Sequence, residues 1–181
     1  MKTALGLLAA ATILTASSLS ATQLSAQSDD PSILPGIQES EGELSPEVQL
    51  YISRGDELSS RLSYDAAVRE YARAADLARR EGHLASRTTW KLANAHFYHG
   101  NLLGAAAALD QLTEEAARVG DLEVEALSIY YAAWLDGKAG RKIEMATRVA
   151  RLQALLRSRF MPVALRDRLR GWLRTSEVAI K

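Results

Sequence analysis

Residues 90–112, with the sequence WKLANAHFYHGNLLGAAAALDQL, determine how the rest of the chain is interpreted. Apolar and small residues recur in this stretch at helical spacing on both sides of Gly100 and Asn101, a pair that is typical of a tight turn. The stretch therefore predicts a helix, a turn and a second helix, with small residues where the two helices touch. Weaker versions of the same pattern lie before and after it.

Helical patterns continue through the chain from Ser45 onward, and no strand pattern competes with them. Ser45, Pro46 and Glu47 form a helix start, with a serine N-cap, a proline at the first helical position and an acid in the first turn. The predicted fold class is all-α. Seven helices are expected, over residues 45–62, 63–82, 86–99, 102–120, 121–140, 142–158 and from 162 onward, with glycines indicating helix ends at Gly82, Gly100, Gly120 and Gly140.

Residues 1–26 have the order of a secretory signal peptide. Lys2 precedes an apolar run, residues 4–14, that is too short to span a bilayer, and Ala26 ends a plausible cleavage site. Cleavage after Ala21 is an alternative, and a retained membrane anchor is another. The chain has no cysteine, so it has neither a disulfide framework nor a site for lipid attachment. We expect a periplasmic or secreted protein that is exported by a bacterial Sec-type route.

Charge divides the chain into an acidic beginning and a basic end, although its formal net charge is zero. Residues 27–47 contain six acids and no base, and residues 27–44 show no helical period, so we predict a flexible acidic linker before a domain at 45–181. Alternatively, Ile33, Leu34 and Ile37 dock on that domain as a short extended piece. From Lys138 onward, twelve bases accompany three acids, which points to an anionic partner or surface.

Three alanines occupy matching places in the second, fourth and sixth predicted helices. Ala67, Ala105 and Ala146 are separated by 38 and 41 residues. Helix pairs repeated at this interval are typical of a stacked solenoid, in which no repeat buries its apolar face alone. The alternative is a helical bundle whose helices pair antiparallel without a superhelix.

This pattern resembles the tetratricopeptide (TPR) repeat family over residues 48–156. The resemblance implies a right-handed solenoid of about three helical hairpins with a C-terminal capping helix. The chain departs from the family because no repeat has the closing proline and the spacing exceeds the usual value of about 34 residues. The matching residues are Leu92, Ala93, Gly100, Leu102, Ala105, Leu109 and Leu112 in the central repeat, Gly55, Tyr64, Ala67, Tyr71 and Ala74 in the first, and Ala133, Gly140, Ala146 and Ala150 in the third.

In TPR-like arrays the first helix of each pair lines the concave surface, so the resemblance implies a partner-binding face there. Aromatic residues and arginine are enriched at the centres of protein interfaces, and asparagine bonds to peptide backbone. We therefore expect a protein scaffold or adaptor that binds a peptide or a partner helix. The alternative for Trp90 and Trp134 is that they fill gaps between repeats. The candidate residues are Arg87, Trp90, Asn94, Phe97 and Tyr98 in the central repeat, Tyr130 and Trp134 in the third, and Ile52 and Asp56 in the first.

No motif of a known enzyme class is present, so we expect neither catalysis nor a cofactor. His96 and His99 lie three residues apart on one predicted helix, but no third histidine, cysteine or suitably spaced carboxylate completes a metal site.

The basic C-terminal helix suggests a second function, attachment to anionic lipid or to a cell-wall polymer. Its arginines flank an apolar line, which gives the helix a basic amphipathic character. The alternative is a capping helix with a solvated basic face. Nucleic acid is not expected as a partner because the chain carries an export signal. The arginines are Arg166, Arg168, Arg170 and Arg174, and the apolar line is Leu165, Leu169, Trp172 and Leu173.

Overall fold

Seven α-helices make up the part of the chain that the computed structural model describes, residues 44–178. The all-α prediction is confirmed, and no strand occurs among the described residues. The predicted signal peptide, and the predicted linker up to residue 43, lie outside them. The helices are α1 (Pro46–Ser60), α2 (Tyr64–Arg80), α3 (Ser86–Tyr98), α4 (Leu102–Val119), α5 (Leu122–Lys138), α6 (Lys142–Leu155) and α7 (Val163–Val178).

The chain reverses after α2, α3, α4 and α5 at a glycine in the left-handed conformation, as the sequence predicts. The amide that follows the glycine donates back to a carbonyl in the last helical turn, for example from Asn101 N to His96 O at 2.9 Å. This bond satisfies a carbonyl that the helix leaves open, and it fixes the direction in which the chain departs. The glycines are Gly82 (φ +85°), Gly100 (φ +81°), Gly120 (φ +76°) and Gly140 (φ +74°).

Helix α1 ends in the same type of turn without a glycine. Leu62 has a φ of +59°, and Ser63 N donates to Leu58 O at 2.9 Å. A side chain in this conformation crowds the following carbonyl at a cost of about 1–2 kcal/mol. The Leu62 side chain is 72% exposed, so packing does not offset that cost. The α1–α2 turn is therefore the strained member of the set.

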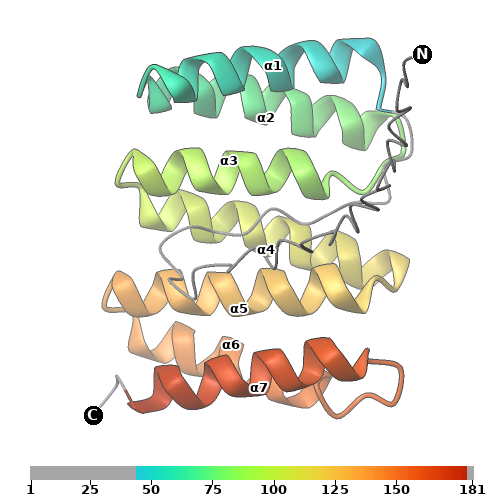
Figure 1. Cartoon of the computed structure of the whole chain (residues 1–181), viewed down its shortest axis with the longest axis vertical. Helices are drawn as coiled ribbons and strands as arrows, with labels where there is room; N and C mark the ends of the chain where they lie inside the picture. The colour runs from blue at the N-terminus through green and yellow to red at the C-terminus, as the bar shows by residue number, and fades with distance from the viewer. Residues whose placement is uncertain (1–43, 179–181) are drawn as a thin grey trace, which may run out of the picture. The chain divides into compact units, whose positions relative to one another are not determined.

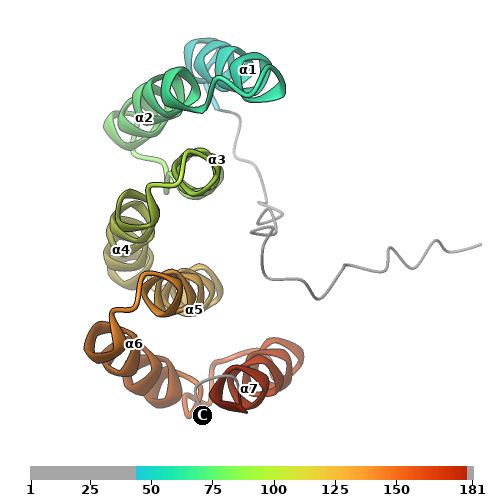
Figure 2. The ribbon, with the colours of Figure 1, turned by 90° about the vertical axis from the view of Figure 1, so that its left-hand side faces the viewer.

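The helices stack in chain order from α1 to α7, and each helix from α1 to α5 packs on the next (Figure 1). Figure 2 shows two layers, with α1, α3, α5 and α7 on one side and α2, α4 and α6 on the other. The turns that join α1 to α2, α3 to α4 and α5 to α6 lie on one edge of the stack, at the left of Figure 1. We call this edge the turn edge.

Most of the core lies between α3 and α7. Large side chains there are completely buried, among them Leu109, Leu135, Leu152 and Leu169. A second cluster joins α1 to α2 around Val48 and Ala74, and Leu44, the last residue of the predicted linker, packs against it. Consecutive hairpins therefore bury their apolar side chains against one another, as in other stacks of helical hairpins.

Alanine at the fourth residue of the even helices allows close helix packing in two of the three cases. Ala67 in α2 and Ala105 in α4 are completely buried. The prediction for the third helix is wrong by one residue, because Ala146 is exposed and Met145 occupies the fourth position. The larger methionine fits because its partner in α5 is Gly137, where an added Cβ would lie 3.0 Å from the Met145 sulfur.

Gly55 in α1 gives the Tyr71 ring of α2 a place to pack. A Cβ added at Gly55 would lie 2.4 Å from Cε1 of that ring. The ring cannot withdraw freely, because the Tyr71 hydroxyl donates to Asp56 Oδ1 at 2.7 Å and lies 3.3 Å from Ser59 Oγ. Burial, the largest cause, raises the Tyr71 pKa well above its usual value, so the hydroxyl keeps its proton at neutral pH.

Helix α7 covers the end of the stack. Leu165, Leu169 and Leu173 join the main core, and the Trp172 ring lies 4.9 Å from the Tyr130 ring of α5. The apolar line of the predicted C-terminal helix is therefore turned toward α5 and α6 rather than toward solvent.

We predict that Leu62→Gly raises the free energy of unfolding by about 1 kcal/mol, because glycine adopts a positive φ without the steric cost. The matched change is Gly100→Ala, where φ is +81° and nothing lies within 4 Å of an added Cβ. It should lower the free energy of unfolding by about the same amount, since only the backbone is affected. Urea denaturation measures both, and a less stable Leu62→Gly protein would contradict the strain that we assign to this turn.

A second prediction concerns Gly55→Ala. Glycine to alanine within a helix usually stabilises by about 0.5–1 kcal/mol. At Gly55 we expect the opposite, a loss of about 1–3 kcal/mol, because the new methyl group overlaps a ring held at its hydroxyl. Gly171→Ala in α7 is the control, since an added Cβ there meets nothing within 4 Å, and it should stabilise. Thermal unfolding of the two variants should therefore shift in opposite directions.

Candidate functional site

Four aromatic rings form a continuous line across the turn edge. Tyr64 stacks on Tyr98 with ring centres 5.4 Å apart, and Phe97 lies 5.4 Å from Tyr98 and 5.5 Å from Trp134. Tyr98 is 47% exposed and the other three rings are half-buried. We call these four residues the aromatic strip.

The positions of these residues within their helices explain why the rings meet. Tyr64 is the first residue of α2, Phe97 and Tyr98 are the last two of α3, and Trp134 lies near the end of α5. Each position is next to a hairpin turn, and the three turns share one edge of the stack (Figure 1). The strip therefore joins all three hairpins, although its members are separated in sequence.

Other exposed apolar side chains surround the hairpin turns. Leu62 lies in the first turn, and Leu103 and Ile143 are the second residues of α4 and α6. The Lys138 ammonium group lies beside the strip, with Nζ 4.6 Å from the centre of the Trp134 ring. Large exposed apolar groups that cluster on one edge mark a surface suited to binding another molecule.

Three of the predicted binding residues, Phe97, Tyr98 and Trp134, are brought together in the strip. From the sequence, Tyr64 is predicted only as a residue of the repeat framework, and Lys138 is not among the predicted binding residues. Tyr64 directly follows the α1–α2 turn, as Leu102 follows the α3–α4 turn. Its place next to a turn was thus a usable signal, but nothing in the sequence shows that its ring stacks on a residue 34 positions later.

Two predicted binding residues belong to the core instead. Trp90 is only 2% exposed, and its ring lies edge-on to Tyr131 with centres 5.1 Å apart. Tyr130 is 6% exposed and packs between Tyr131 and Trp172. We therefore correct their assignment to a partner-binding face. The burial of Trp90 agrees with the alternative prediction, in which this residue fills a gap between repeats.

The remaining predicted residues lie on α1 and α3. Asp56 accepts hydrogen bonds from the Tyr71 hydroxyl at 2.7 Å and from Lys91 Nζ at 2.6 Å, so it links α1, α2 and α3. Ile52 is buried in the α1–α2 cluster. Arg87 and Asn94 are half-buried on α3. Asp56 and Ile52 therefore stabilise the fold. Their place in the first repeat does not by itself show that these side chains contact neighbouring helices.

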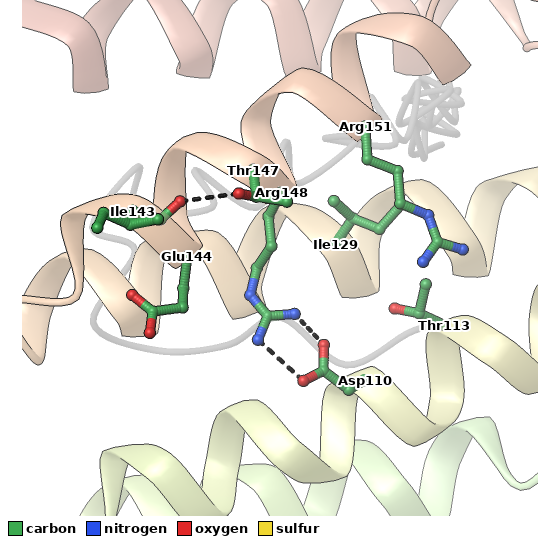
Figure 3. Close-up of a pocket in the computed structure, with 8 residues that line it drawn as sticks. All are labelled: Asp110, Thr113, Ile129, Ile143, Glu144, Thr147, Arg148 and Arg151. Carbon is green, nitrogen blue, oxygen red and sulfur yellow. Dashed lines mark hydrogen bonds and ion pairs between the residues drawn. The ribbon is translucent and has the colours of Figure 1, made fainter.

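A cleft of about 350 Å³ opens between α4, α5 and α6 (Figure 3). The Arg148 guanidinium reaches across it from α6 and makes a bidentate ion pair with Asp110 of α4, while its Nε donates to Asp136 of α5 at 2.6 Å. Asp136 is completely buried, and Arg141 Nη1 approaches its other oxygen at 3.3 Å. The lining residues are Asp110, Thr113, Ile129, Ile143, Glu144, Thr147, Arg148 and Arg151.

The charges in this cleft neutralise one another. Burial by itself lowers the pKa of Arg148, but its hydrogen bonds to Asp110 and Asp136 outweigh that effect and hold the pKa above its usual value. Arg151 pairs with Glu114 at 2.9 Å and with Glu125 at 3.0 Å. Because both guanidinium groups are already paired, the cleft is better suited to holding helices together than to binding an anion.

The same arrangement joins α2 to α4. Arg79 of α2 donates from Nε to Glu115 of α4 at 2.6 Å and from Nη2 to Thr89 of α3 at 2.9 Å. Helix α4 thus supplies carboxylates toward both of its even neighbours, and arginines of α2 and α6 reach toward it. These pairs are the polar connections between consecutive hairpins.

His96 of α3 and His99, the residue that follows the helix, belong to no metal cluster among the described residues. No group of three or more histidine, cysteine or acidic side chains suited to a metal ion occurs within residues 44–178. His96 Nδ1 lies 3.4 Å from Asn101 Nδ2 at the α3–α4 turn. Burial, with a smaller contribution from His99, lowers the His96 pKa, so the ring is neutral at physiological pH.

We predict that Arg148→Met lowers the free energy of unfolding by about 3 kcal/mol, because it leaves the buried Asp136 carboxylate without its closest partner. Adding Asp136→Asn to this variant should restore part of the loss by removing the buried charge. Arg69→Met is the control, since the Arg69–Asp65 pair is exposed and should be worth less than about 1 kcal/mol. Urea denaturation measures the three proteins, and equal losses for Arg148→Met and Arg69→Met would contradict this role.

Comparison of the chain with models of protein families, with curated proteins and with solved structures gave no match. No helix within residues 44–178 combines the length and apolar character needed to cross a bilayer. The TPR-like solenoid and the partner-binding role therefore stay predictions that rest on the residues themselves.

Proposed function

We propose that this protein is an exported, TPR-like scaffold or adaptor that binds a peptide or a helix of a partner protein. The observation that carries the proposal is the aromatic strip, in which partly exposed rings from three hairpins run along one edge of the stack. The proposal includes no catalytic step and no cofactor. Export is supported by the character of residues 1–26 in the sequence.

Three features support the TPR-like part of the proposal. The helices stack as consecutive hairpins in two layers (Figure 2). Ala67 and Ala105 are buried at the same position of α2 and α4, and the hairpins repeat at intervals of 38 and 40 residues when Met145 is taken as the third marker. Helix α7 covers the last hairpin, as the capping helix of a solenoid does.

The chemistry of the strip favours an apolar protein segment as the partner. Tyrosine and tryptophan contribute large contact areas with few rotatable bonds, and they are enriched among residues that dominate binding energy. Leu62, Leu103 and Ile143 extend the apolar surface around the hairpin turns. Lys138 is exposed beside Trp134 and is placed to pair with an acidic residue that flanks the apolar segment. We therefore expect a short motif with aromatic or aliphatic anchors and an acidic neighbour.

A peptide library displayed on phage and selected against the purified protein tests this proposal. Selected peptides should share apolar anchors, and their affinity should fall at least about tenfold for the combined change Tyr98→Ala and Trp134→Ala, because truncating central aromatic residues typically costs more than about 1.4 kcal/mol. Fluorescence anisotropy of a labelled peptide measures the affinity.

Val119→Ala is the matched control, because Val119 is exposed at the end of α4, away from the aromatic strip. It should leave the affinity unchanged. Circular dichroism and thermal unfolding establish that the strip variant retains its fold. The proposal would be contradicted if the selected peptides bound the strip variant as tightly as the original protein. It would also be contradicted if the selected peptides shared no motif.

A further inference from the structure

Two large apolar side chains are exposed at the end of the stack formed by the α6–α7 loop and the start of α7. Phe160 is 70% exposed and Val163 is 66% exposed. Neither contributes to the described core, where Met161, between them in sequence, is buried. An exposed phenylalanine is costly to leave in water, so its position here calls for a physical reason.

The loop that carries Phe160 is held in place by its own hydrogen bonds. Arg166 of α7 donates from Nη2 to Ser158 O at 2.7 Å and to Met161 O at 3.0 Å. Phe160 N donates to Ser158 Oγ at 3.3 Å. The loop is therefore ordered on both sides of Phe160, and the ring is presented outward by a rigid support. Because the Arg166 Nη2 group already donates to these two carbonyls, we do not count Arg166 among the residues that bind a ligand.

Four exposed arginines lie on the same loop and along α7. Arg159 lies over the Phe160 ring, 4.7 Å from its centre. Arg170 and Arg174 are exposed on α7, and helical spacing places them on the same outward stripe as Val163. Arg157 is exposed in the loop. Among the side chains up to Thr175, the last one that the structure describes, none of the four has an ion-pair partner, whereas the arginines of the α4–α6 cleft are paired. We call Arg157, Arg159, Phe160, Val163, Arg170 and Arg174 the basic end.

The basic end differs from the amphipathic surface that the sequence suggests. The apolar line of α7 is buried in the core, so it is not free to enter a lipid surface. The exposed apolar groups come instead from the loop and the first residue of α7. Among the side chains described up to Thr175, one acid, Asp167, shares the outward stripe, so the basic end with Asp167 carries a charge of three positive units.

We propose that the basic end docks on a bilayer surface that contains anionic lipids. Phe160 and Val163 enter the boundary between head groups and acyl chains, and the arginines contact the head-group phosphates. Apolar insertion combined with several cations is the pairing that peripheral membrane proteins use, because neither alone gives stable attachment. Arg159, stacked on Phe160, would lie at the level of the head groups when the ring is buried.

Exposed apolar side chains favour a lipid surface over a soluble polyanion. A polymer of phosphates or carboxylates would pair with the arginines but would gain nothing from Phe160 or Val163. A bilayer uses both kinds of group at once. The proposal is independent of partner binding at the aromatic strip, because the strip lies on the turn edge and the basic end lies at the α7 end of the stack (Figure 1).

Flotation of the purified protein with vesicles tests the proposal. Vesicles of phosphatidylcholine and phosphatidylglycerol are compared with vesicles of phosphatidylcholine alone, and the salt concentration is varied. Binding should require phosphatidylglycerol and should weaken as salt rises. Each arginine near an anionic surface is worth about 1 kcal/mol, so Arg170→Gln combined with Arg174→Gln should reduce the partition coefficient about 25-fold. Phe160→Ala should reduce it about tenfold through lost insertion.

The control combines Arg54→Gln with Arg80→Gln, which removes two exposed arginines from α1 and α2 at the opposite end of the stack. It has the same net charge as the arginine variant and should bind like the original protein. All variants share the same N-terminus, so any contribution from residues 1–26 cancels in the comparison.

Two results would overturn the proposal. The first is equal binding of all variants to the anionic vesicles. The second is loss of binding in the arginine variant but not in Phe160→Ala, together with equally strong binding of the original protein to soluble polyglutamate. That second result would make the basic end a general polyanion surface rather than a membrane-docking one.

Discussion

The left-handed turn that closes each of the first five helices is the constraint on which the rest of the structure depends. At Gly82, Gly100, Gly120 and Gly140 the turn costs little, because glycine tolerates a positive φ, and at Leu62 it is made at a steric cost. Each turn fixes the direction of the next helix, so alternate turns gather on one edge of the stack. The aromatic strip exists because Tyr64, Tyr98 and Trp134 lie next to those turns.

The ion pairs and the exposed apolar side chains have different roles: the ion pairs hold helices together, and the exposed side chains are available to another molecule. Arginines of α2 and α6 reach carboxylates of α4, and they tie consecutive hairpins together on the side of the even helices. These groups are paired with one another, which leaves little free charge for a ligand in the α4–α6 cleft. The strip and the basic end differ from the cleft, because Tyr98 of the strip and Phe160 and Val163 of the basic end are exposed apolar groups. Proteins keep such groups where another surface covers them.

Helix positions could be predicted from the sequence because glycine turns and N-caps are local signals, and the predicted cap Ser45 accepts a hydrogen bond from Val48 N through its hydroxyl. Burial was harder. Trp90 and Trp134 both lie on odd helices. Trp90 is buried against the Tyr131 ring of α5, whereas Trp134 packs on Phe97 of α3 and under the Lys138 ammonium group and stays half-buried. The register error at Ala146 has a similar origin, since Gly137 makes room for Met145 across the helix pair. Contacts between helices determine the burial of the two tryptophans and the register at Ala146, and these contacts could not be predicted from a single sequence.

The most direct test of this division is photochemically induced dynamic nuclear polarisation in an NMR spectrum of the free protein, which reports the tyrosine and tryptophan rings that a dye in solution can reach. The account predicts enhanced signals from Tyr98 and Trp134, and none from Trp90 or Tyr131, which is buried in the core. Enhancement of Trp90 with no signal from Tyr98 and Trp134 would contradict it, because the face assigned to the core would then be the one open to a partner.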